Sequence, residues 1–162
     1  MNAYDVAAWS DFAQTVGGGA AALAGLLFVG LSMNLTEVLT YPALPARAAA
    51  TLALLIAIVL VTLFLATPGQ TAQAVGLEIG AVGVLMTAGA VVAALRQRGG
   101  RGSSKTLYSL ALLGIPTALL IVGGISLWFE RGGGLYWITA SAATSLVAST
   151  ANAWVLLVEI KR

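Results

Sequence analysis

The sequence predicts an all-α protein, a polytopic transmembrane helical bundle of about five spans, and three observations support that prediction. The 162-residue chain is 59% hydrophobic. Only 9% of its residues are charged, whereas soluble domains carry about 25%. Apolar segments of about 20 residues, the length that crosses a bilayer, follow one another through short connectors. We therefore expect a single transmembrane domain that fills residues 1–162.

A short amphipathic stretch, residues 1–16, precedes the first long apolar segment. Ala8 and Phe12 recur at helical spacing, and Trp9 suits a membrane interface. The stretch is therefore either an interfacial helix or the first turns of a long first span. Because it carries two aspartates and no basic residue, we expect no cleavable signal peptide.

The first two spans are bounded by proline-containing turns. We place the first at about 17–39, because Pro42 and Pro45 then interrupt the helical hydrogen bonds. The second, at about 46–66, is the most uniformly apolar and stops at the turn 67–70. Its composition leads us to expect that it faces lipid.

Three further spans complete the bundle, at about 71–95, 107–129 and 135–160. The fourth contains Pro116, so we expect a kink there. A run of three glycines, 132–134, separates the fourth span from the fifth.

The distribution of basic residues predicts the orientation. With five spans, an N-terminus outside and a C-terminus in the cytoplasm, seven basic residues lie on the cytoplasmic side and one lies outside. Such an excess is the positive-inside signal of multi-pass proteins. The cytoplasmic set is Arg47, Arg96, Arg98, Arg101, Lys105, Lys161 and Arg162, and the outer residue is Arg131.

The residue inventory excludes many enzyme classes. The chain contains no cysteine and no histidine, which removes thiolate zinc sites, iron–sulfur clusters and histidine-based triads. Both aspartates lie outside the spans, and both lysines lie at span ends. We therefore expect no enzyme, no catalytic residue, no metal and no cofactor. A formal charge of +2 gives no indication of nucleic acid as a partner.

A weakly polar stripe follows one face of the fifth span. At 100° per residue its members share that face, and they are Ser141, Ser145, Ser149, Asn152 and Glu159. Such a stripe either allows close packing and hydrogen bonding between helices or lines a water-filled path.

Two asparagines fall at similar depth in the inner half of the bilayer. Asn34 lies near the inner end of the first span and Asn152 near that of the fifth, so a reciprocal amide bond between them is plausible. Glu37 and Glu159 follow near the cytoplasmic boundary, where Arg47, Lys161 or Arg162 could reach them. The group is either a structural lock or an ion site.

The third span combines a glycine face with one carboxylate. Gly76, Gly80 and Gly83 share a face, and Gly76 and Gly80 have the spacing that lets helix backbones approach. Glu78 points almost the opposite way. Three roles remain open for it: reaching to the outer surface, a subunit contact, or a titrating carboxylate on a permeation path.

The loop between the third and fourth spans is basic. Its positive side chains, Arg96, Arg98, Arg101 and Lys105, determine topology and are candidates for binding anionic lipid headgroups.

Four segments carry a resemblance to a known family: AGLLFVGLSMN at 24–34, YPALPAR at 41–47, GGLYW at 133–137 and NAWVLLVEI at 152–160. In these the chain resembles small actinobacterial membrane proteins labelled modulators of the FtsH protease. The resemblance covers nearly the whole chain. It implies a bacterial cytoplasmic (inner) membrane and a regulatory partner, and we transfer no functional residue from it.

Two functions therefore compete. The first is a non-enzymatic accessory or regulatory subunit that contacts another membrane protein, or copies of itself, through its helices. The second is a homo-oligomeric ion channel or ion-coupled carrier whose path is lined by the fifth span or by Glu78. A hydrated cavity that continues past Asn152 would favour the second, and a tightly packed stripe would favour the first.

Overall fold

The computed structural model describes residues 3–41, 44–97 and 103–160, and within these ranges it is helical without a strand. This confirms the all-α prediction. The elements in chain order are the 3₁₀ helix η1 (Val6–Trp9) and the helices α1 (Ser10–Met33), α2 (Leu35–Thr40), α3 (Leu44–Ala66), α4 (Ala72–Gln97), α5 (Ser103–Trp128) and α6 (Leu135–Ile160).

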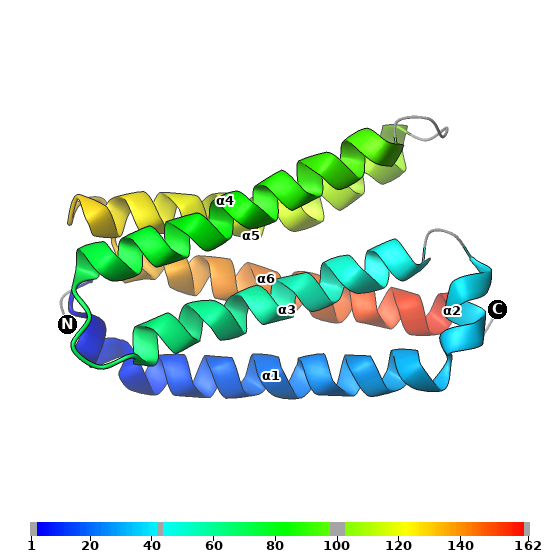
Figure 1. Cartoon of the computed structure of the whole chain (residues 1–162), viewed down its shortest axis with the longest axis horizontal. Helices are drawn as coiled ribbons and strands as arrows, with labels where there is room; N and C mark the ends of the chain where they lie inside the picture. The colour runs from blue at the N-terminus through cyan, green and yellow to red at the C-terminus, as the bar shows by residue number, and fades with distance from the viewer. Residues whose placement is uncertain (1–2, 42–43, 98–102, 161–162) are drawn as a thin grey trace.

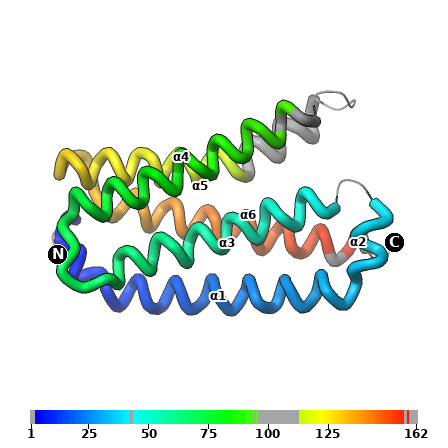
Figure 2. The backbone as a smooth tube through the Cα atoms, viewed as in Figure 1, coloured from blue at the N-terminus to red at the C-terminus, as the bar shows by residue number. Residues whose placement is uncertain are grey.

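The long helices form a bundle around α3 and α6, which run through the middle of the molecule (Figure 1). Helix α1 lies along one side of this pair, and α4 and α5 lie together on the other. Consecutive long helices alternate in direction. Toward the end marked C, α4 rises away from α3 (Figure 2).

The first helix differs in its bounds from the expected span at 17–39. It begins at Ser10, directly after η1, so residues 10–16 of the amphipathic stretch form the first turns of α1. It ends at Met33, because Asn34 leaves the helical conformation (φ −120°, ψ 31°) and its amide donates to the carbonyl oxygen of Gly30 at 2.8 Å. Asparagine commonly competes with the backbone in this way. Helix α2 then continues separately.

Three helical segments of the described chain are long and apolar enough to cross a membrane: Val6–Met33, Leu44–Ala66 and Ala72–Ala93. A shorter apolar segment is Leu113–Trp128. Large apolar side chains also cover the surface, with Leu26 71% and Leu85 72% exposed. Since soluble proteins rarely expose apolar patches so extensively, these features indicate a membrane protein.

The expectation that the most apolar span faces lipid is wrong. Half of the apolar window of α3 is buried, compared with 11% for the first helical segment and 22% for α4. Leu54, Leu55 and Leu65 are each at most 2% exposed. Protein core and lipid tails are equally apolar, so composition alone does not distinguish the two environments. The position of α3 between its neighbouring helices places its apolar side chains in the protein core.

Helix α5 continues through Pro116, which is buried and does not end it. Beyond its last residue the chain turns tightly into α6. Gly132, Gly133 and Gly134 all have positive φ, as does Glu130. Glycine adopts this conformation without steric cost, which explains the glycine run.

The N-terminal segment is held against this turn. The Ala3 carbonyl oxygen accepts the Leu135 N–H at 2.9 Å, and the Tyr4 hydroxyl accepts the Gly133 N–H at 3.0 Å. Ser126 adds two bonds: its hydroxyl accepts the Gly134 N–H at 2.8 Å and donates to the Arg131 carbonyl. These contacts join the start of the chain to the α5–α6 connection.

Candidate functional site: polar groups in the helical core

The polar stripe of α6 lies inside the protein. Ser141, Ser145, Ser149 and Asn152 are between 1% and 3% exposed. Since they recur every three or four residues, they share one face, and that face is directed toward the other central helices. The fifth predicted member, Glu159, has a side chain outside the described residues.

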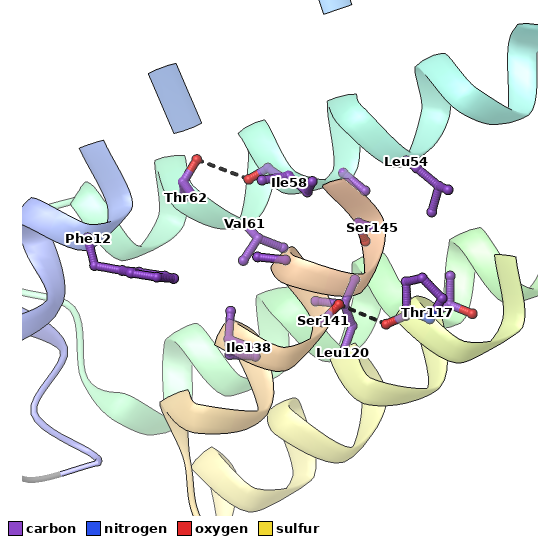
Figure 3. A pocket seen from close by; sticks show the side chains of 13 residues that line it. Phe12, Leu54, Ile58, Val61, Thr62, Thr117, Leu120, Ile138, Ser141 and Ser145 are labelled. Carbon is purple, nitrogen blue, oxygen red and sulfur yellow. Dashed lines mark hydrogen bonds between the residues drawn. The ribbon is translucent and has the colours of Figure 1, made fainter. Parts of the chain in front are cut away.

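Ser141 connects α6 to α5. Its hydroxyl donates to the carbonyl oxygen of Pro116 at 2.8 Å (Figure 3). Both residues are buried, so the bond satisfies a hydroxyl that would otherwise be costly in an apolar core.

Asn152 connects α6 to α3. Its amide nitrogen donates to the Thr51 hydroxyl and to the Arg47 carbonyl oxygen, the latter at 3.3 Å. Its amide oxygen accepts from the Arg47 guanidinium at 3.4 Å. Both ends of the amide are therefore used across this helix pair.

The expected bond between Asn34 and Asn152 is therefore wrong. Asn34, which follows the last residue of α1, donates back to the Gly30 carbonyl of that helix, whereas Asn152 is bound by residues of α3. Equal depth in the bilayer does not determine which helix faces meet. Glu37, expected nearby, is exposed on α2.

Ser149 is a buried member of the stripe whose hydroxyl makes no hydrogen bond within the described part of the chain. Its hydroxyl oxygen is buried and has no partner among the described groups. Small hydroxyl residues permit close packing of helices even without a bond across the interface. Ser149 therefore fits the packing interpretation of the stripe.

A small cavity of about 10 Å³ lies between α3, α5 and α6, capped by Phe12 of α1 (Figure 3). That volume is close to the minimum for one water molecule. Its walls include Ser141 and Ser145 but neither Ser149 nor Asn152. This cavity therefore does not continue along the stripe past Asn152.

The hydroxyls of the other polar residues that line this cavity are occupied. Thr62 donates to the Ile58 carbonyl at 3.0 Å, and Thr117 donates to the Leu113 carbonyl at 2.9 Å. Both bonds stay within a helix. The remaining walls are mainly apolar side chains: Leu54, Ala57, Ile58, Val61, Pro116, Leu120, Ile138 and Ala142.

The glycine face of α4 packs against α5. A Cβ added at Gly76 would lie 2.8 Å from the Gly124 carbonyl oxygen, and one added at Gly124 would lie 2.8 Å from the Gly80 Cα. At Gly83 it would lie 2.8 Å from the Ile121 side chain. The two backbones therefore approach as closely as small-residue spacing allows.

Glu78 is half-buried on another face of α4. Its Oε1 accepts from the Gln70 amide nitrogen at 3.4 Å, so its side chain extends back toward the connector between α3 and α4. Helical side chains generally point this way, toward the helix N-terminus. The bond brings the carboxyl to the level of this connector.

The side chains of the predicted basic cluster lie outside the described part of the chain. Arg98 and Arg101 lie outside the described residues, as do the side chains of Arg96 and Lys105. The described part of the chain also contains no group of three or more acidic residues positioned to hold a metal ion.

The sequence analysis did not identify the residues that form hydrogen bonds with Asn152 and Glu78. Thr51 is the clearest case: it follows Arg47 by one helical turn, which places both on one face of α3 where Asn152 meets them. Gln70 was treated only as part of a turn. A polar residue in a turn next to a membrane carboxylate is the signal that could have identified it.

Comparisons of the chain with protein-family models, with curated proteins and with solved structures found no match.

Proposed function

We propose that this protein is a non-enzymatic accessory or regulatory subunit of the bacterial cytoplasmic membrane, acting through helix–helix contacts with another membrane protein. The observation that carries the proposal is the contrast between a polar stripe that is buried inside the protein and an open small-residue face on α1. The stripe that could have lined a path is packed inside the protein. We therefore infer that the surface that contacts the partner lies on the outside of the bundle.

The open face of α1 consists of Gly18, Ala22 and Gly25, which lie one helical turn apart and are exposed. A Cβ added at Gly18 or Gly25 would have no atom within 4 Å. Membrane helices associate through such small residues because their backbones can approach closely. Phe28, 63% exposed, extends the same surface.

The proposal includes a topology of five spans, α1, α3, α4, α5 and α6, with the N-terminus outside. Two features support it. The long helices alternate in direction (Figure 1), and the basic residues are concentrated on the side assigned to the cytoplasm. The resemblance to proteins labelled modulators of the FtsH protease makes a membrane protease complex the first partner to examine.

The test is co-purification of the full-length protein from native membranes in mild detergent. We expect a monomer or dimer together with a membrane partner, and we expect Gly18→Leu with Gly25→Leu to reduce recovery of that partner about tenfold. Gly89→Leu, at another open glycine, is the matched control and should leave recovery unchanged.

A ring-sized homo-oligomer that conducts ions and is unaffected by the α1 substitutions would reject the proposal. The burial of the α6 stripe inside the protein supports the accessory role over a channel whose path is lined by that stripe.

A further inference from the structure

The ends of three helices are buried at the end of the bundle where the chain starts. Leu65 lies next to the last residue of α3, Leu127 lies next to the last residue of α5, and Leu135 is the first residue of α6. Each of the three is at most 2% exposed. No further turn of its own helix covers a residue in this position, so another segment must do so. Figure 1 shows the N-terminal segment at this end of the bundle.

Residues 3–12, which we call the strap, provide this cover. Val6 is 6% exposed and belongs to the same core cluster as Leu65, Leu127 and Leu135. Other side chains of the strap pack against that cluster, namely those of Tyr4 and Trp9. Because apolar contacts of this kind exclude water, the strap is part of the barrier between solvent and the interior of the bundle.

Hydrogen bonds attach the strap to the start of α6. The first N–H groups of a helix have no acceptor within that helix, and the Leu135 N–H donates instead to the Ala3 carbonyl oxygen at 2.9 Å. The Tyr4 hydroxyl accepts the Gly133 N–H at 3.0 Å. The strap therefore satisfies backbone groups of the α5–α6 connection as well as covering the core.

The last residue of the strap reaches the internal cavity. Phe12 lines the cavity between α3, α5 and α6, and its ring points toward Val61 and Ile138 (Figure 3). The Trp9 ring meets the Phe12 ring edge to face, with centroids 5.5 Å apart, and meets the Tyr136 ring in the same way at 5.2 Å. A continuous series of contacts therefore runs from the first turn of α6 through Trp9 to the ring that caps the cavity.

We propose that the strap is a lid that controls access to this cavity from the end of the bundle where the chain starts. With the strap in place, the two serines on the cavity wall, Ser141 and Ser145, are 1% and 3% exposed. Displacement of the strap removes Val6 from the core cluster and Phe12 from the cavity, and it opens a path from solvent to these hydroxyls. Ser149 is not on the cavity wall, so this path does not extend to it. The lid concerns the interior of the bundle and does not depend on the partner proposed for α1.

The experiment uses the absence of cysteine from the sequence. In the full-length protein, Ser145→Cys introduces a single thiol on the cavity wall. Its rate of reaction with a small water-soluble methanethiosulfonate is measured in nanodiscs, alone and combined with Val6→Ala or Val38→Ala. Val38→Ala is the matched control, because Val38 is 4% exposed in a separate core cluster, on α2, and loses the same two methyl groups.

We expect Val6→Ala to raise the labelling rate about tenfold, since the lost contacts increase the population of the open strap. Val38→Ala should leave the rate unchanged. A rate that rises equally in both variants would show general loosening of the bundle, and a rate that rises in neither would show that the strap does not close the cavity. Either result would overturn the proposal.

Tyr4→Phe tests the strap with a change that leaves its apolar contacts in place. It removes only the hydroxyl that accepts the Gly133 N–H, so we expect labelling at Ser145→Cys to rise about fivefold. Ser149→Cys is the control for position, and its labelling should respond to neither Val6→Ala nor Tyr4→Phe. Equal acceleration at Ser149→Cys and Ser145→Cys would contradict a lid that serves the cavity alone.

Discussion

The two halves of α4 have similar apolar composition, but among the described side chains only the first half contains buried residues. In the first half Val75 and Ile79 are fully buried, and the glycines meet α5 at backbone distance. In the second half Leu85 is 72% exposed, and a Cβ added at Gly89 would contact nothing within 4 Å. The difference coincides with the place where α4 leaves α3 (Figure 2).

This contrast shows that glycine on a membrane helix has two meanings. Where a neighbouring backbone lies against it, glycine determines how closely two helices pack. Where nothing lies against it, glycine contributes only backbone freedom. Substitutions at the two kinds of position should therefore differ greatly in effect, and the following predictions test that difference.

The largest effect is expected at the closest contact between α4 and α5. Gly124→Val would place a Cβ 2.7 Å from the Gly76 carbonyl oxygen and 2.8 Å from the Gly80 Cα. These are backbone atoms, so relief requires the helices to separate. We expect a loss of about 3 kcal/mol in the free energy of unfolding, measured in mixed detergent micelles.

Gly89→Val is the control for this prediction. It introduces the same side chain at a glycine with open space around it, and its effect should stay within about 0.5 kcal/mol. Equal losses at the two positions would show that the tight packing of α4 on α5 does not determine stability.

A smaller effect is expected where α3 and α6 are joined by polar groups. Asn152→Leu removes the acceptor of the Arg47 guanidinium and the donor to Thr51. We expect a loss of about 1–2 kcal/mol. Asn34→Leu removes a local bond from the residue after α1 back to Gly30 and should cost less. If the two variants lose equal stability, the α3–α6 connection has no special role.

The fold class followed from the sequence because composition and segment length constrain it strongly. Helix bounds were close for α6, where glycines and basic residues mark both ends. They differed for α1, because the break at Asn34 depends on whether its amide finds the Gly30 carbonyl. A local competition of that kind leaves no periodic signal.

Composition and segment length did not predict whether each helix faces lipid or other helices. The apolar α3 was assigned to lipid, yet it lies between α1 and α6 (Figure 1). The glycine face of α4 gave a usable signal, because small-residue spacing specifies a close neighbour. The partners of Asn152 and Glu78 depended on which faces meet, and this is decided by packing over the whole bundle.

The smallest effect is expected at the end of the bundle where the N-terminal segment meets the α5–α6 turn. Ser126→Ala removes the acceptor of the Gly134 N–H and the donor to the Arg131 carbonyl. Arg131 is exposed, so water replaces the bond to its carbonyl, whereas the buried Gly134 N–H loses its acceptor, and we expect a loss of about 1 kcal/mol. Ser32→Ala is the matched control, since the exposed Ser32 hydroxyl bonds only to its own helix. This substitution should change the free energy of unfolding by less than about 0.5 kcal/mol.

Hydrogen exchange at the Gly134 amide distinguishes a local effect of Ser126→Ala from a global one. Exchange that accelerates at Gly134 but not in the middle of α3 would show that this connection closes one end of the bundle independently of its core, whereas unchanged exchange at Gly134 would contradict the role assigned to Ser126.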